Sequence, residues 1–112
     1  MRSEDFLNKE VEVIIDRPIN SKHPKYNFLY EVNYGYIPNT ISGDGEELDV
    51  YILGVNKALK EFRGKCIAII RRLNENDDKL IVVENEKSFT DKEIREATYF
   101  QEKWFDSIII RG

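Results

Sequence analysis

The sequence has only one cysteine and one histidine among its 112 residues. The single cysteine, Cys66, can form neither an internal disulfide nor a cysteine-based zinc site. It lies in the apolar run 66–70, and we expect it to be a buried core residue, as free cysteines commonly are. The single histidine, His23, cannot supply a site that needs two histidines.

The chain also lacks a long apolar stretch and a block of basic residues. Residues 1–5 are polar and lead to no long apolar run, so we expect neither a signal peptide nor a transmembrane helix, and no membrane partner. A reducing cytoplasm is therefore the expected location. Acidic and basic residues are interspersed and the formal net charge is −4, whereas nucleic-acid-binding proteins usually carry a basic stripe. No nucleic-acid partner is expected, and an acidic protein that handles a polyanion needs cations to mediate the contact.

The length of 112 residues fits one domain, 1–112, with a single moderate core. Hydrophobic residues make up 41% and aromatic residues 12% of the chain, which indicates a packed globule rather than a disordered segment.

Short runs of β-branched and aromatic residues predict a mainly β fold. Strands are expected over 11–16, 48–53, 65–73 and 79–84, and short extended pieces joined by a bend over 28–37. The third and fourth of these strands are expected to form a hairpin. Because side chains alternate along a strand, Leu48, Val50 and Ile52 should point one way and Asp49 and Tyr51 the other.

One helix is predicted near the C-terminus. Thr90 and Glu93 have the spacing of a capping box, and an apolar stripe continues from Ile94 through Trp104 to Ile108. We expect Trp104 to lie in the core. Several short strands and one C-terminal helix favour a small OB-like five-stranded barrel, closed or partly open, although periodicity alone does not single out this topology.

Three carboxylates, Asp44, Glu46 and Asp49, lie within six residues just before and at the start of a predicted strand. Carboxylates that converge repel each other unless a cation lies between them. Their hard oxygen atoms suit Mg²⁺ or Mn²⁺. The alternative is a solvated acidic turn without a ligand.

The segment Asn33-Tyr34-Gly35-Tyr36-Ile37, followed at a fixed distance by residues 44–50, resembles the signature of the soluble inorganic pyrophosphatases of the OB-barrel family. The match is dense from Tyr30 to Val50. It is weaker but colinear from Glu12 to the C-terminal helix. The chain therefore resembles a shortened and divergent member of that family.

The resemblance implies a set of metal-binding acids. In the family's pattern the acids that hold metal ions correspond here to Asp44, Glu46 and Asp49, and Glu46 stands where the family has an aspartate that serves as general base. A fourth metal ligand corresponds to Asp77, or to Asp78 if the turn is shifted. Glu12 resembles a further acid of the site.

The resemblance also implies the residues that contact substrate and take part in catalysis. Lys25, Tyr30, Tyr34 and Lys79 correspond to substrate-binding positions, and Tyr34, Glu46 and Asp49 to catalytic ones. Taken without the resemblance, the tyrosines read as ordinary sheet residues and the lysines as surface residues.

Two family features are missing from this sequence. A hairpin that carries a phosphate-binding arginine is absent between Tyr26 and Tyr30. Trp104 and Phe105 stand where the family has a Tyr-Lys pair on its helix. Both departures remove polar groups that would contact phosphate.

The function that the resemblance implies is metal-dependent hydrolysis of inorganic pyrophosphate to two phosphates, with Mg²⁺ or Mn²⁺ as cofactor and a rate below that of longer relatives. The alternatives are hydrolysis of another phosphoanhydride or nucleotide, and a non-catalytic phosphate- or metal-binding module. The expected partner is a small phosphate-containing substrate, and assembly into a homo-oligomer stays open.

Overall fold

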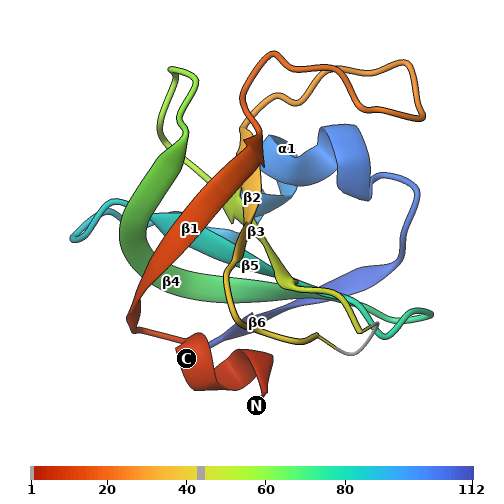
Figure 1. The fold of residues 1–112 in the computed structure, drawn as a ribbon. Helices are drawn as coiled ribbons and strands as arrows, with labels where there is room; N and C mark the ends of the chain where they lie inside the picture. Colours follow the sequence, from red (N-terminus) through yellow and green to blue (C-terminus); the bar gives the residue numbers. More distant parts are fainter. Residues whose placement is uncertain (1, 43–44) are drawn as a thin grey trace.

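The computed structural model describes residues 2–42 and 45–112 (Figure 1). The described elements, in chain order, are η1 (Ser3–Phe6), β1 (Glu10–Arg17), β2 (Asn33–Ile37), β3 (Leu48–Ile52), β4 (Glu61–Arg72), β5 (Asp78–Val83), α1 (Asp91–Glu102) and β6 (Ser107–Arg111). The predicted mainly β fold with one helix is confirmed.

The strands close into a barrel in the order β1-β2-β3-β5-β4, with β4 pairing back to β1. Closure is possible because β4 is long: its first part pairs with β1 from Glu61 to Lys65, and its later part pairs with β5 and β6. All these pairs are antiparallel except β3 with β5. The predicted five-stranded barrel is confirmed, as is the β4–β5 hairpin.

The alternation of side chains along the strands produces two apolar clusters. Leu48, Val50 and Ile52 of β3 belong to the cluster inside the barrel, together with the fully buried Cys66. Tyr51 belongs to a second cluster on the outer wall, where β2, β3, β4 and β5 pack against Ile94 and Phe100 of α1. The predicted alternation in β3 and the predicted burial of Cys66 are both confirmed.

The segment 33–37 has a structural role at two of its positions. A Cβ at Gly35 would overlap the backbone carbonyl of Ile14 on β1, so only glycine lets the two strands approach this closely. The Asn33 side chain is fully buried, accepts from the amides of Ile19 and Leu59 at 3.0 and 3.1 Å, and donates to the Lys57 carbonyl at 2.9 Å. Asn33 thus ties two loops to β2.

The helix is shorter than predicted. It ends at Glu102, and the apolar residues Ile108, Ile109 and Ile110 form β6 against β4 instead of continuing the helical stripe. Three consecutive β-branched residues favour a strand once a neighbouring strand offers hydrogen bonds. Trp104 lies beyond the helix and is 58% exposed, so its predicted place in the core is wrong.

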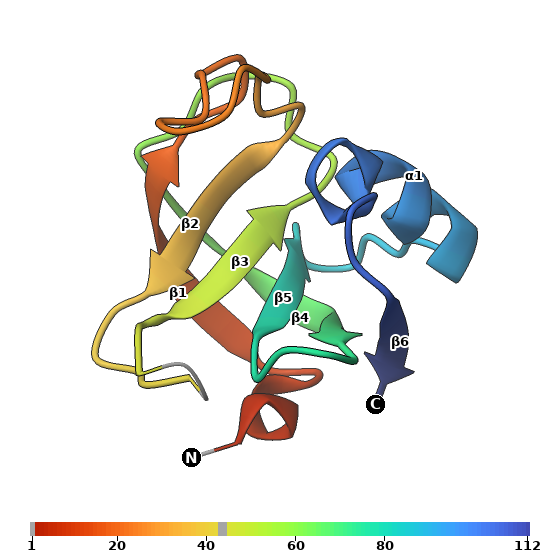
Figure 2. The ribbon, with the colours of Figure 1, turned by 90° about the vertical axis from the view of Figure 1, so that its right-hand side faces the viewer.

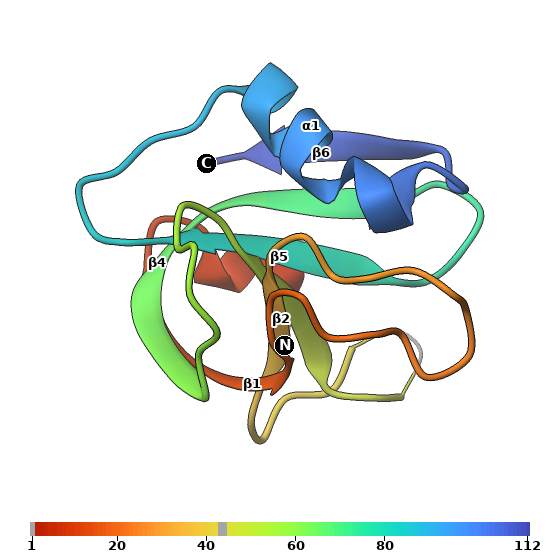
Figure 3. The same cartoon turned by 90° about the horizontal axis from the view of Figure 1, so that it is seen from above.

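Helix α1 and the loop formed by residues 18–32 both lie in the upper half of the molecule in Figures 1 and 2, on the side away from η1. The view from above shows α1 lying over the sheet beside β6, and the loop extending past β2 (Figure 3). No helix in the part of the chain that the structure describes is long and apolar enough to cross a membrane.

Replacing Thr90 by alanine should lower the free energy of unfolding by about 1 kcal/mol and the melting temperature by roughly 4 °C. The Thr90 hydroxyl accepts from the Glu93 amide at 3.1 Å, while the Glu93 carboxylate accepts from the Thr90 amide at 2.9 Å. Calorimetry measures the change. Thr90→Ser is the control, because serine keeps the hydroxyl; equal losses in both variants would contradict a capping role.

Candidate active site

A cleft of about 620 Å³ opens on the outer face of the barrel wall, between the C-terminal end of α1 and the loop 18–32. Its floor comes from three strands, since Tyr34 lies on β2, Asp49 on β3 and Lys79 on β5. These residues share a face because Tyr34 is paired with Tyr51, which lies two residues after Asp49 on β3, and Asp49 is paired with Lys79 across the parallel β3–β5 ladder. The remaining lining residues are Asp16, Arg17, His23, Tyr26, Phe28, Tyr30, Arg72, Gln101, Trp104 and Phe105.

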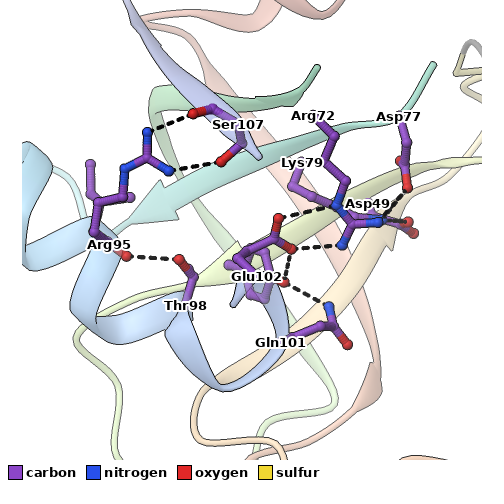
Figure 4. Close-up of polar contacts among 11 residues, drawn as sticks. Asp49, Arg72, Asp77, Lys79, Arg95, Thr98, Gln101, Glu102 and Ser107 are labelled. Atoms are coloured by element: carbon purple, nitrogen blue, oxygen red, sulfur yellow. Dashed lines mark hydrogen bonds and ion pairs between the residues drawn. The ribbon is translucent and has the colours of Figure 1, made fainter. Parts of the chain in front are cut away.

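The Lys79 ammonium lies between two carboxylates. Its Nζ is 2.6 Å from Asp49 Oδ2 and 3.0 Å from Asp77 Oδ2, as Figure 4 shows. The Lys79 side chain is 5% exposed, so its charge has to be compensated by partners within the protein. Asp49 is the more accessible of the two acids, with 30% of its side chain exposed against 13% for Asp77.

Arg72 continues this network toward α1. Its guanidinium donates to Glu102 at 3.1 and 2.7 Å and to Asp77 at 3.1 Å, and it stacks 3.7 Å from the centre of the Phe105 ring. Burial opposes the charged form of Arg72, yet the ion pairs with Glu102 and Asp77 raise its pKa. The same Glu102 accepts from the Tyr51 hydroxyl at 2.5 Å, and this hydroxyl accepts from Gln101 (Figure 4).

The tyrosines of the cleft are held as neutral phenols. Burial raises the pKa of Tyr34 well above its ordinary value, and the Asp49 carboxylate raises it further. Burial also raises the pKa of Tyr30, although a hydrogen bond with Arg17 acts in the opposite direction. A neutral tyrosine beside Asp49 can donate a hydrogen bond to an anion in the cleft.

Five of the residues singled out in the sequence come together here. Tyr30, Tyr34, Asp49 and Lys79 line the cleft, and Asp77 reaches Lys79 and Arg72 from the turn before β5. They come from three parts of the chain, 30–34, 49 and 77–79, which the fold brings together. Of the two acids that the sequence left as alternatives, Asp77 is the one that contacts the cleft residues Lys79 and Arg72.

Asp78 and Glu12 lie elsewhere. The Asp78 carboxylate pairs with Arg71 at 2.9 Å, and the same guanidinium contacts Glu4, because successive side chains of a strand point to opposite faces. Glu12 is exposed, faces Arg63 across the β1–β4 pair and forms an ion pair with it. Four residues of strand, about 13 Å, separate Glu12 from the end of β1 that reaches the cleft. Neither residue lines the cleft.

The remaining predicted residues are in loops. Lys25 has an exposed side chain, and its amide donates to Nδ1 of His23; it belongs to the loop that borders the cleft without being one of the lining residues. Glu46 is exposed in the turn before β3, where its carbonyl accepts from the Ser42 amide. Asp44 lies outside the described residues.

The sequence interpretation missed Asp16, Arg17 and Arg72. A period of two could have found Arg72, since Ile70 is on the outer wall and Arg72 follows it by two residues. Asp16 lies four residues after Glu12 on the outward side of β1, next to the strand end that reaches the cleft. Arg17 and Arg72 bring guanidinium groups to a cleft in which the sequence predicts a loss of cationic contacts.

The acids of this cleft carry the kind of oxygen donor that hard divalent cations prefer. Burial raises the pKa of both Asp16 and Asp77, and in each case the charge of Asp49 adds to the rise, with Arg17 opposing it at Asp16 and Lys79 at Asp77. The carboxylates thus repel one another, and oxygen donors are the preferred ligands of Mg²⁺. Within residues 2–42 and 45–112, no three histidine, cysteine or acidic side chains are grouped closely enough to hold an ion by themselves.

Comparisons with known protein families show which family the chain belongs to. A sequence model described as "Inorganic pyrophosphatase" matches residues 7–109. The chain belongs to the inorganic pyrophosphatase family. An inorganic pyrophosphatase of Rickettsia prowazekii is 33% identical over 101 residues, which cover 71% of this chain and 59% of the relative. One of Rickettsia bellii is 30% identical over 118 residues, covering 90% and 62%. The chain thus spans about six-tenths of the length of these curated relatives.

Solved structures of the family share the fold. The inorganic pyrophosphatase of Ehrlichia chaffeensis superposes with a TM-score of 0.72 at 20% identity, covering 94% of this chain and 87% of that one. The enzyme from Thermus thermophilus gives a TM-score of 0.60 at 18% identity, covering 90% and 80%. The likeness in fold agrees with the OB-like barrel that the sequence predicts.

Arg72→Met should lower the free energy of unfolding by about 3 kcal/mol, because it leaves the Glu102 carboxylate buried without its cation. Urea unfolding measures the loss, and adding Glu102→Leu to this variant should restore part of it. Arg63→Met is the control: Arg63 is 63% exposed, and its removal should cost less than about 1 kcal/mol. Equal losses from Arg72→Met and Arg63→Met would show that the Arg72 network does not hold the helix.

Proposed function

We propose that this protein hydrolyses inorganic pyrophosphate to two phosphates in a metal-dependent reaction. The observation that carries the proposal is the meeting of Asp49, Asp77 and Lys79 with Tyr34 in one cleft of a chain that belongs to the inorganic pyrophosphatase family. Tyr34 lies on β2, Asp49 on β3, Lys79 on β5 and Asp77 just before β5, so their convergence is not a by-product of one turn.

Hydrolysis of a phosphoanhydride requires positioning and charge neutralisation more than covalent chemistry from the protein. A water oxygen bonds to one phosphorus, the bridging P–O bond breaks, and the second phosphate leaves with the bonding electrons. Lys79 and Arg17 would neutralise charge on the phosphate oxygens, and Tyr34 would donate a hydrogen bond to them. The proton released by the water goes to a carboxylate, for which Glu46 is our assignment from the family pattern.

Mg²⁺ or Mn²⁺ held by Asp49 and Asp77, with Asp44 and Glu46 as further ligands that the family pattern implies, would supply the positive charge that acidifies water and screens the substrate. Lys79 keeps Asp49 and Asp77 in fixed positions relative to each other. Arg72 holds Asp77 from its other side, so this acid is oriented by two cations.

The rate should be lower than that of longer relatives. Glu46 is one methylene longer than the aspartate of the family pattern, and catalytic geometry is sensitive to such displacements. Trp104 and Phe105, both in the cleft lining, cannot donate the charged contacts of a Tyr-Lys pair. Location in the cytoplasm and assembly into a homo-oligomer stay predictions.

Asp77→Asn should reduce Mg²⁺-dependent phosphate release from pyrophosphate on the order of a hundredfold, since the variant loses a charge that orients Lys79 and that would bind the proposed metal ion. A colorimetric phosphate assay measures the rate. Asp78→Asn is the matched control, because this neighbouring acid faces Arg71 and should retain the wild-type rate. A comparable loss in both variants, or no phosphate release with either metal, would refute the assignment.

Mg²⁺ or Mn²⁺ should raise the melting temperature, because an ion that binds only the native protein stabilises it by about 2.7 kcal/mol at a hundredfold excess over its Kd. The shift is the melting temperature with metal minus the melting temperature of the same protein in EDTA. In Asp49→Asn most of this shift should be lost. Asp78→Asn should keep it. If Asp49→Asn shows the full shift, the ions bind at another place.

A further inference from the structure

The cleft has two chemically different parts. Its floor carries Asp49, Lys79 and Arg72, whereas its rim is a row of rings in the order Tyr26, His23, Phe28 and Trp104. The centroids of neighbouring rings in this row are 4.9, 4.9 and 5.5 Å apart. The two ends of the row are open to solvent, with Tyr26 63% and Trp104 58% exposed.

Hydrogen bonds and ring contacts hold the side chains of the rim in place. Nδ1 of His23 accepts from the amides of Lys25 and Tyr26 at 3.0 and 3.1 Å, which fixes the imidazole and the backbone that carries Tyr26. Burial lowers the pKa of His23, and the charges of Arg17 and Lys25 lower it further, which favours the uncharged ring. Phe28 connects the loop to Trp104 on the opposite wall.

Inorganic pyrophosphate has no apolar or aromatic group that would pack against this rim. It is a small polyanion that needs cations and hydrogen-bond donors, and the floor supplies these. A cleft of about 620 Å³ lies in the range typical of sites for molecules much larger than a diphosphate. Exposed aromatic rings beside a cationic floor match a ligand that joins a flat ring system to a phosphate chain.

The cations also support this assignment. Lys79 and Arg72 form salt bridges with carboxylates, whereas Arg17 forms none within residues 2–42 and 45–112 and interacts with the neighbouring Asp16 through its charge alone. Arg17 contacts the Tyr30 hydroxyl and lines the cleft with the rings. An arginine in this place can bind a phosphate oxygen while a base stacks on the rim.

We propose that the ring-lined rim is a base-binding subsite and that the cleft takes nucleoside diphosphates, with the diphosphate on the cationic floor and the base stacked on Trp104 or Tyr26. The proposal rests on the proposed function, because the diphosphate of the nucleotide would bind the same cleft floor that binds pyrophosphate in the proposed function. Stacking of a base on an aromatic side chain contributes about 1–3 kcal/mol, which corresponds to roughly fivefold to a hundredfold in affinity.

The test compares two non-hydrolysable probes in the presence of Mg²⁺, adenosine 5′-(α,β-methylene)diphosphate and methylenediphosphonate. Isothermal titration calorimetry should show the nucleotide probe binding at least about fivefold more tightly. Since Trp104 is the single tryptophan of the chain, the nucleotide probe should also change its fluorescence, and methylenediphosphonate should do so much less. Equal affinities, or no binding of either probe, would overturn the proposal.

Trp104→Ala should lower the affinity ratio of the two probes about tenfold, and Trp104→Phe should restore part of it. Tyr99→Ala is the matched control, because Tyr99 is 65% exposed on α1 and is not one of the lining residues. An equal fall in the ratio for Tyr99→Ala would contradict the subsite. Because neither probe is hydrolysed, a protein that discriminates between them without hydrolysing pyrophosphate would keep this proposal and refute the proposed function, and the reverse pattern would refute the subsite alone.

Discussion

The ion pair between Arg72 and Glu102 is the contact on which the cleft depends. It joins the end of β4 to the last turn of α1 and is buried on both sides, with 8% and 6% of the side chains exposed. A buried pair of this kind is costly to desolvate and stabilises the fold only when its remaining donors and acceptors are satisfied. Here they are satisfied by Asp77, by Tyr51 and by the Phe105 ring. The position of the helix end, and with it the wall formed by Trp104, follows from this network.

Acidic and basic side chains alternate along this network. From α1 to β3 the groups run Glu102, Arg72, Asp77, Lys79 and Asp49, so each cation lies between two acids and the one inner acid, Asp77, lies between two cations. Only the last acid, Asp49, has appreciable access to solvent. The chain of ion pairs therefore presents one carboxylate to the cleft while the rest of its charge is compensated internally.

Much of the architecture could be predicted from local patterns. The alternation in 48–52 placed Asp49 outside the barrel, and the Thr90–Glu93 spacing placed the start of the helix. The end of the helix could not be found in this way, because the isoleucines of 107–111 fit a helical stripe as well as a strand until the partner strand β4 is present. Tertiary pairing overrode local preference at this point.

The site was predicted in part, for a related reason. A resemblance concentrated in 30–50 identified Tyr34 and Asp49, but it carries little information on β1, where Asp16 rather than Glu12 reaches the cleft.

The closed arrangement of the barrel also affects how the chain folds. Closure pairs 10–14 with 61–65, and the Tyr51 hydroxyl meets Gln101 across fifty residues of chain. Contacts of such sequence separation form slowly, since their loop entropy is lost before they are made. The cleft takes residues from β1, β2, β3, β4, β5 and α1, so no partly folded form can bind a ligand there, and during refolding the ability to bind returns only with the last long-range contacts.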